Sequence, residues 1–548
     1  MLAKETVENR RRLLASLTRL ANLMLNGGVP KFACPALYGA SLCALTKKDG
    51  GIRPIAVGSV LRRVTAKIAA KHATGLLASQ FTPRQLGVGT PGGCEAIIHA
   101  AREFIKFSSE LNSPQIFIKV DVSNAFNSID RPAFLSEIAQ NCPQIFPLMR
   151  QAYGFSSPIF YGKTKLLSET GLHQDDPLAS LAFSLAINPI IGAISSPFNA
   201  WYLDDGAFGG GLEQTLDDLG MLGRALLQIG LKLNQSKCEI PILSSPTTIA
   251  YNSTLARVRQ KMPNITETLS NRLTLLGAPL GVAGLNSSLS KCSRKVELIC
   301  DRVQTLDSHW ALFFLTRYAS APRLNHMLRS SPAYLQPDIL DTIDALISDT
   351  LVKCINVQLP GNTWSQATLP LRFGGLGVRS VADLALPCYI SSINSSLELV
   401  HKIYTAVGEA TVPESLLSAV AEFQARFPYC EMPDGEAVMR QRAWDDISCT
   451  TRFSDLIAPA NQVHRARLLA AKEPHSGAWL KTVPLPNLGL HLDDATIRVA
   501  VALRVGATIC EPQNCRCGRL VDRLGHHGLS PVGTVLAAFP VTLTSMTW

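Results

Sequence analysis

The chain has 548 residues, of which 47% are hydrophobic and 17% are charged. This composition is typical of a folded protein of about two to four domains and excludes a disordered chain. A net charge of +10 suits a polyanionic partner such as nucleic acid, although enzymes with other substrates can be equally basic.

The N-terminal residues 1–34 predict an amphipathic helix, because apolar side chains recur at helical spacing from Leu13 to Met24. Two acidic residues, Glu5 and Glu8, favour an ordinary packed helix over a mitochondrial transit peptide. No secretory signal opens the chain, and its fourteen cysteines are spread without regular pairing. We therefore expect free thiols and an intracellular protein of the cytoplasm or nucleus.

The next elements alternate between strand and helix. Residues 42–59 predict a hairpin around Asp49–Gly51, and a basic helix follows over 61–78. A β-prone run, IFIKVDV, ends near Asp121, and Asp130 and Pro132 are expected to open a helix as its cap and first-turn residues.

Residues 177–203 carry no charged side chain and resemble a membrane span. Asn188-Pro189 interrupts the run and acidic pairs lie at both ends, so we interpret it as a buried core helix and expect no membrane association.

Residues 199–212 predict a strand, a tight acidic turn and a second strand. A helix over 215–230, a strand over 232–243 and a short hairpin over 272–281 are expected to follow. The order predicts an α+β fold with an antiparallel centre, and a mainly helical region from 285 to 400. A breakpoint is expected near residues 405–435.

Three carboxylates could converge in this arrangement, because Asp121 ends a predicted strand and Asp204 and Asp205 occupy a predicted hairpin tip. Mg²⁺ prefers carboxylate oxygens and binds substrate phosphates, and a pair of such ions can assist phosphoryl chemistry. The alternative is that Asp-Asp-Gly only makes a good turn.

Five segments occur in a fixed order between residues 118 and 281: IKVDVSNAFNSID, GLHQDDPLASLAF, WYLDDGAF, GLKLNQSKCEI and LLGAPLG. Together they resemble the palm motifs of reverse transcriptases, in particular those of non-LTR retrotransposons. KKDGGIRPIAVGSVLRRVTAKIAAK resembles the fingers of that family, QLGVGTPGGCEAIIHA its linking segment, and LPLRFGGLGVRS the stretch after the thumb.

The resemblance implies a right-hand polymerase fold with fingers, an antiparallel-sheet palm and a helical thumb. The expected parts are an N-terminal helix (1–34), fingers and linking segment (35–115), palm (116–284), thumb (285–400), a C-terminal helical region (401–504) and a Cys/His-rich truncated tail (505–548).

The resemblance also implies the catalytic groups. Asp121 and Asp204 would be the main ligands of two Mg²⁺ (or Mn²⁺) ions, with Asp205 a weaker ligand. Lys237 would protonate or neutralise the leaving pyrophosphate; the alternative is a surface lysine.

Further residues would bind the nucleotide and the duplex. Phe126 would lie beneath the incoming sugar and exclude a 2′-hydroxyl, unless it is an ordinary core aromatic, and Gln174 would lie near the template or incoming base. Guanidinium and ammonium groups suit phosphate, so the fingers candidates for the triphosphate are Arg53, Arg62, Arg63 and Lys67, with Arg53 the first choice. The candidates for the duplex path in the thumb are Arg317, Arg323, Arg329, Arg372 and Arg379.

The C-terminal tail resembles a zinc-knuckle-like region that precedes an endonuclease in some non-LTR elements. Its candidate Zn²⁺ ligands are Cys510, Cys515, Cys517, His526 and His527, and the alternative is a set of unliganded thiols. Pro531 stands where the family has a further cysteine, and after Ser530 the chain departs from the family.

The implied function is RNA-directed DNA polymerisation on an RNA template, with a DNA primer and dNTPs as partners. The alternative is an impaired retroelement remnant that only binds RNA or DNA. Two departures from the family motivate that alternative: no endonuclease follows Ser530, and Asp175 stands where family members usually carry glycine in the QDDP motif. A glycine permits a positive φ and close approach of the backbone to a ligand, so we predict weakened polymerisation that Asp175→Gly partly restores.

Overall fold

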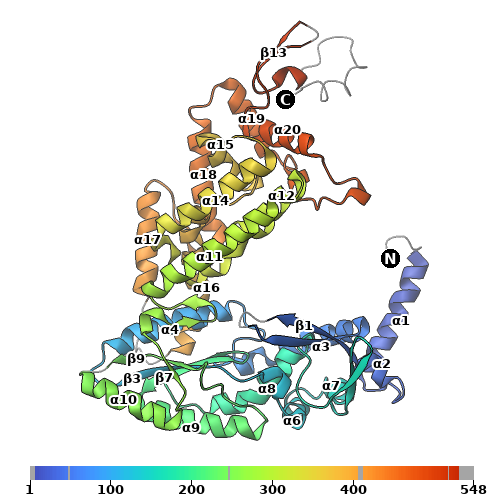
Figure 1. The fold of residues 1–548 in the computed structure, drawn as a ribbon, viewed down its shortest axis with the longest axis vertical. Coiled ribbons are helices and arrows are strands. Elements are labelled where there is room, and N and C mark those ends of the chain that lie inside the picture. The colour runs from blue at the N-terminus through green and yellow to red at the C-terminus, as the bar shows by residue number, and fades with distance from the viewer. Residues whose placement is uncertain (1–6, 47–49, 245–246, 405–411, 516–517, 530–548) are drawn as a thin grey trace. The chain divides into compact units, whose positions relative to one another are not determined.

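The computed structural model describes residues 7–46, 50–244, 247–404, 412–515 and 518–529. The chain forms two compact units, residues 1–281 with 396–411 and residues 282–395 with 412–548 (Figure 1). Each unit has its own hydrophobic core, and each is described separately below.

A six-stranded sheet forms the centre of the first unit. The path through it runs β10 (Thr266–Glu267), β8 (Glu239–Ile240), β3 (Gln115–Val120), β7 (Asp205–Gly211), β6 (Phe198–Tyr202), and β9 (Ile242–Ser244) also pairs with β3. All pairings are antiparallel except that of β10 with β8. The α+β class with an antiparallel centre is therefore confirmed.

Both faces of β3 are buried, and its side chains alternate between two cores. Ile116, Ile118 and Val120 join the core that contains α8 (Ala179–Gly192) and α9 (Leu212–Gln228), whereas Phe117 joins the core built on α4 (Gly93–Ser109). The end of α16 (Val381–Ile403) also joins the second core, where Tyr404 packs edge-on against Phe104 at 5.4 Å. Figure 1 shows α4 on one side of the sheet and α9 on the other.

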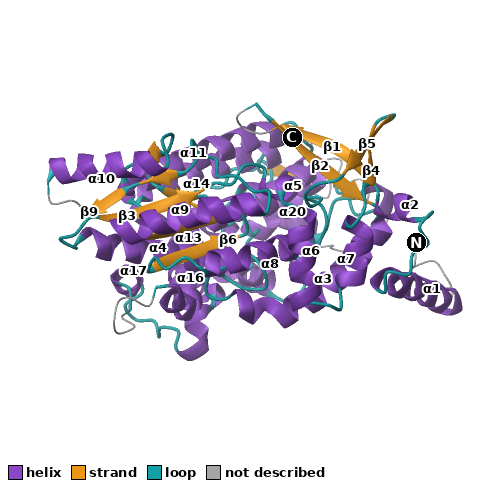
Figure 2. Ribbon diagram, turned by 90° about the horizontal axis from the view of Figure 1, so that it is seen from below, coloured by secondary structure: helices purple, strands orange, loops and turns teal. Residues whose placement is uncertain are grey.

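A second sheet joins two strands of the expected fingers segment to two strands of the expected palm segment. Its order is β2 (Ile52–Gly58), β1 (Ala40–Thr46), β4 (Ser157–Tyr161) and β5 (Thr164–Ser168). β1 and β2 are antiparallel and their register runs from Ala40–Gly58 to Thr46–Ile52, which confirms the predicted hairpin. The basic helix is confirmed as α3 (Val60–Phe81), which is capped by the Ser59 side chain. Figure 2 shows this sheet beside helices α6 (Arg131–Asn141) and α7 (Phe146–Tyr153).

The uncharged segment after Pro177 forms α8, a core helix as predicted, in which every residue from Leu181 to Ile187 is buried. Within the described part of the chain, no helix has both the length and the apolar character that crossing a bilayer requires.

The second unit is mainly helical. Its longer helices are α11 (Val282–Val303), α13 (Ala321–Ser330), α14 (Pro337–Ile355), α17 (Glu414–Arg426), α18 (Gln441–Ile457), α19 (Gln462–Lys472) and α20 (Asp494–Val505), together with most of α16. The core contains leucines of α11 and α14 together with Ile497 and Val501 of α20. Residues from both sides of the expected boundary at 400 thus share one core.

Several local predictions were wrong. Helix α1 (Val7–Leu25) is not packed along its length, since only Met24 is buried. Asp130 is the N-cap residue of α6 and Pro132 lies in its first turn, as predicted, but the Asp130 side chain makes no capping hydrogen bond. The predicted strand over 232–243 is limited to β8 and the start of β9, because Pro241 has no N–H for a ladder and a turn occupies 235–237. One boundary between the two units, after residue 411, lies inside the expected breakpoint at 405–435, and helix α17 also lies within that range.

Candidate active site

The acidic pair at 204–205 lies at the tip of the hairpin formed by β6 and β7. Tyr202 pairs with Asp205 across the two strands, so Leu203 and Asp204 make up the turn. Gly206 follows because no side chain fits there: a Cβ atom would lie 2.3 Å from the Trp201 ring. The sequence WYLDDG therefore builds a tight turn on which two carboxylates are adjacent.

Asp121 comes to the same place from the neighbouring strand. β3 pairs antiparallel with β7, and the last pair is Val120 with Gly206. One residue further along this register, Asp121 lies next to Asp205. The structure thus brings together the three predicted carboxylates.

The proximity of the carboxylates changes their acidity. Burial and the charge of Asp205 raise the pKa of Asp204 to about 6, with a further contribution from Asp121, while Arg53 opposes the rise. The pKa of Asp205 is also raised, mainly by desolvation, and Lys119 opposes this effect. A bound cation would stabilise the ionised form of these neighbouring carboxyl groups, because its positive charge offsets their mutual repulsion.

The donor set fits divalent cations in its chemistry. All three predicted ligands are carboxylates, which hard cations prefer. Among the described residues no group of three or more His, Cys, Asp or Glu side chains is arranged so that it could hold a metal ion. The fit of the three carboxylates to Mg²⁺ therefore rests on the chemistry of the donors, since Mg²⁺ prefers carboxylate oxygens and keeps waters and substrate oxygens among its ligands.

The backbone of Asp121 is held by the segment that precedes β8. Asn234 N–H donates to the Asp121 carbonyl at 2.8 Å, and Asp121 N–H lies 3.4 Å from the Cys238 sulfur. Burial raises the pKa of Cys238 to about 11, so this thiol stays protonated. Sequence reasoning missed Cys238, and its only signal was its place within the NQSKCE motif.

The other predicted site residues lie on the surrounding elements. Arg53 in β2 is exposed, and it is near enough to Asp204 to lower that residue's pKa. Gln174 and Lys67 are exposed, and Lys237 is an exposed residue of the turn before β8. Phe126 stacks on Phe183 with ring centroids 4.7 Å apart, so it is partly a core aromatic.

Arg62 is not available as a phosphate ligand, and this prediction requires correction. Its side chain is 3% exposed and lies 2.7 Å from Asp176. Asp176 also accepts a hydrogen bond from Tyr153 at 2.8 Å, and Arg62 donates to the Tyr38 carbonyl at 2.7 Å. Because the donors of the Arg62 guanidinium are satisfied inside the protein, the residue has a structural role: it joins α3 to the turn at residues 174–177, the QDDP turn.

The unexpected Asp175 has a partner of its own. Its carboxylate lies 2.9 Å from Arg63, the next residue along α3, and both side chains are partly exposed. Two consecutive arginines thus face two consecutive aspartates. The negative charge that replaces the usual glycine is offset by Arg63, which was one of the predicted triphosphate ligands.

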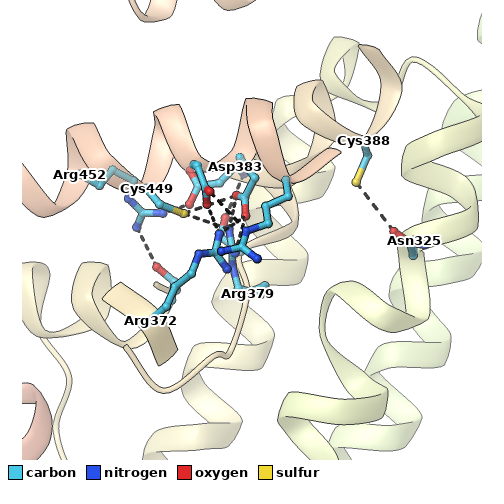
Figure 3. A network of polar contacts seen from close by, with 12 residues as sticks. Asn325, Arg372, Arg379, Asp383, Cys388, Cys449 and Arg452 are labelled. Atoms are coloured by element: carbon cyan, nitrogen blue, oxygen red, sulfur yellow. Dashed lines mark hydrogen bonds and ion pairs between the residues drawn. The ribbon is translucent and has the colours of Figure 1, made fainter. Parts of the chain in front are cut away.

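The candidate thumb arginines differ in their availability. Arg317 and Arg323 are exposed. Arg329 donates to Ser391 and Gln441, Arg379 pairs with Asp445 at 2.6 Å, and Arg372 pairs with Asp446. Figure 3 shows Arg372 and Arg379 in a network with Asp383, Cys449 and Arg452. Only the first two are therefore kept as candidates for nucleic-acid contact.

The C-terminal candidates for zinc do not form a ligand cluster within the described residues. His526 Nδ1 lies 2.7 Å from Asp522, and the Cys510 thiol donates to the Asp522 carbonyl at 3.5 Å. Cys517 lies outside the described residues. Every cysteine in the described ranges is a free thiol, as predicted.

The geometry agrees with an independent comparison. Residues 45–277 match the family model described as reverse transcriptase (RNA-dependent DNA polymerase). The matched residues all lie within the first unit. All three carboxylates, Arg53 and the Arg63–Asp175 pair lie within the matched residues.

The wider chain is similar to a protein of a mobile element. It is 22% identical over 516 residues to the retrotransposable element SLACS 132 kDa protein of Trypanosoma brucei gambiense, covering 92% of this chain and 38% of that protein. The predicted resemblance to reverse transcriptases of non-LTR retrotransposons is confirmed. The chain spans well under half the length of this relative.

Solved telomerases show only a distant likeness. The Candida albicans enzyme in complex with a telomeric RNA fragment is 9% identical, with a TM-score of 0.39 over 74% of this chain and 64% of that one. The apo enzyme of Candida tropicalis is 12% identical, with a TM-score of 0.36 over 67% and 68%. Similarity at this level assigns neither a substrate nor a residue.

Proposed function

We propose that the protein is an RNA-directed DNA polymerase. The observation that carries the proposal is the juxtaposition of Asp121 with the Asp204–Asp205 turn inside a reverse transcriptase domain. In the reaction, the 3′-hydroxyl of a DNA primer attacks the α-phosphate of a dNTP. The new P–O bond forms as the bond to the β-phosphate oxygen breaks, and pyrophosphate leaves.

Reverse transcriptases as a family use divalent cations. In this chain Asp121, Asp204 and Asp205 would hold two Mg²⁺ or Mn²⁺ ions. When bound, such ions lower the pKa of the attacking hydroxyl and stabilise the leaving pyrophosphate.

The remaining groups would position the nucleotide. Arg53 projects from an exposed strand and influences Asp204, so its guanidinium is suited to the triphosphate. Lys67 and Lys237 are exposed cations that could neutralise phosphate charge. Phe126 is held in place by its stacking on Phe183, which suits a ring that excludes a 2′-hydroxyl. Gln174 is proposed to contact the template or incoming base.

The test is primer extension on an RNA template with dNTPs and Mg²⁺ or Mn²⁺. We expect incorporation by the wild-type chain and a loss of about 100-fold or more in Asp204→Asn, because one carboxylate charge is removed from the reacting centre. Asp217→Asn is the matched control: it removes an exposed carboxylate on α9 of the same unit and should leave the rate unchanged.

Binding of primer–template without extension in either metal would overturn the proposal. That result would support the alternative, a remnant that only binds nucleic acid. Preferential incorporation of rNTPs would instead indicate an RNA polymerase.

A further inference from the structure

The turn that carries Asp204 has a strained backbone. Leu203 has a φ of 58°, in the left-handed region that residues with a side chain rarely adopt. Such a conformation persists only where surrounding contacts hold it, and it concentrates at functional sites. Contacts with neighbouring residues are therefore needed to hold Leu203 in this conformation.

A single buried side chain, Gln85, binds both backbone groups of Leu203. Leu203 N–H donates to Gln85 Oε1 at 2.8 Å, and Gln85 Nε2 donates to the Leu203 carbonyl at 3.1 Å. Gln85 Oε1 also accepts from Gly87 N–H at 3.1 Å, and the residue is 0% exposed. The amide thus has a defined partner for its donor and for its acceptor.

The segment that contains Gln85 is itself fixed against β6. Leu86 N–H donates to the Trp201 carbonyl at 2.8 Å, and Trp201 N–H donates to the Arg84 carbonyl at 2.7 Å. Gly87 allows close approach, because a Cβ atom there would lie 2.7 Å from the Leu203 nitrogen. The contacts to Leu203 therefore come from a segment, residues 84–87, whose own backbone is hydrogen-bonded to β6.

The chemistry of the contact requires a carboxamide of this length. A glutamate at this position could not donate to the Leu203 carbonyl, and it would add a negative charge beside an already acidic turn. An aliphatic side chain would leave the N–H and the C=O without these partners. Asparagine has the right groups but is one methylene shorter.

We propose that Gln85 is a positioning residue for the catalytic hairpin: its amide holds Leu203 in the strained turn and so keeps Asp204 and Asp205 within reach of Asp121. The expected effect of Gln85 on catalysis rests on the proposed function. Its effect on the conformation of the turn does not, so the two effects can be tested separately.

The experiment compares the full-length wild-type chain with Gln85→Leu and Gln85→Asn. Hydrogen–deuterium exchange of the peptide that covers residues 201–206 reports on the turn, and single-nucleotide incorporation reports on kcat and KM. Gln151→Leu is the matched control, because the Gln151 amide binds both backbone groups of Val29 at 3.3 and 2.9 Å in the same unit.

In both Gln85 variants we expect exchange at 201–206 to rise about tenfold or more, since the hydrogen bonds that protect the turn are lost. We expect kcat to fall about tenfold or more, with the KM for primer–template unchanged. Gln151→Leu should lower the melting temperature without either effect.

Unchanged exchange at 201–206 in Gln85→Asn, the variant that keeps a polar side chain, would overturn the proposal. An equal rise in Gln151→Leu would also overturn it, because the effect would then be general loosening. If the wild-type chain does not incorporate nucleotides, the proposed function fails, and the exchange measurement alone decides the role of Gln85.

Discussion

His173 illustrates how a single residue in the QDDP turn depends on its surroundings. It is 5% exposed. Arg62 lies 3.1 Å from its Nδ1, and Ser168 Oγ lies 3.2 Å from its Nε2. Because a guanidinium can only donate, Nδ1 accepts, and the neutral ring carries its proton on Nε2. Burial and the positive charge of Arg62 lower the pKa of His173 to about 3.

This depressed pKa predicts a loss of stability in acid. The unfolded chain takes up a proton on His173 near pH 6.5 and the folded chain does not, so the stabilisation is complete above pH 6.5 and falls as the pH drops toward 3. Between pH 6.5 and 5 the loss is about 2 kcal/mol. Urea unfolding of wild type and His173→Gln should show a stability difference that changes by about this amount from pH 7.5 to 5. A difference independent of pH would contradict the neutral assignment.

Helix α3 connects the expected fingers to the QDDP turn through two neighbouring ion pairs. The buried Arg62–Asp176 pair is the structural one, since removing one partner would leave the other charge buried. The Arg63–Asp175 pair is partly exposed, and pairs of this kind contribute at most about 1 kcal/mol. It can therefore be broken without unfolding the unit.

This difference sharpens the prediction for Asp175→Gly. The substitution should increase dNTP incorporation several-fold, because it removes a carboxylate and releases Arg63 to bind phosphate. Steady-state kinetics should show the gain mainly as a lower KM for dNTP. Adding Arg63→Gln to Asp175→Gly should abolish the gain. Equal activity of the wild type and Asp175→Gly would refute the prediction that Asp175 weakens polymerisation.

The whole chain carries an excess of basic residues, but many of its arginines are committed to internal pairs. In the second unit Arg379 is bound to Asp445, whereas Arg317 and Arg323 are exposed. Only solvent-exposed cations release counterions when they meet phosphate. Nucleic-acid affinity should therefore depend on a few of these arginines and not on the net charge.

We expect Arg317→Gln combined with Arg323→Gln to weaken binding to an RNA–DNA primer–template. The slope of log K against log salt should fall by about 1 to 2, one phosphate contact for each arginine. Fluorescence anisotropy across a salt series measures both quantities. Arg426→Gln is the control, since Arg426 and Glu422 form an ion pair within α17 and both side chains are exposed. A slope equal to that of the wild type would exclude these two residues from the interface.

Much of the active-site region could be predicted from local sequence. A β-prone apolar run identifies β3, turn-forming residues identify the hairpin at 204–205, and an uncharged apolar run identifies α8. These features depend on periodicity and turn chemistry that act over a few residues. The order of the motifs was enough to indicate the family, and with it the three carboxylates.

Tertiary structure decided which polar side chains remain free to act. Arg62 and Arg63 are indistinguishable in sequence, yet one is buried against Asp176 and the other lies at the surface against Asp175. In the sequence Gln85 is one polar residue of the segment QLGVGTPGGCEAIIHA, whereas in the folded chain its amide binds Leu203, 118 positions away. The physical reason is that periodicity and turn propensity are local, whereas the partner of a buried charge or amide is set by packing between distant segments.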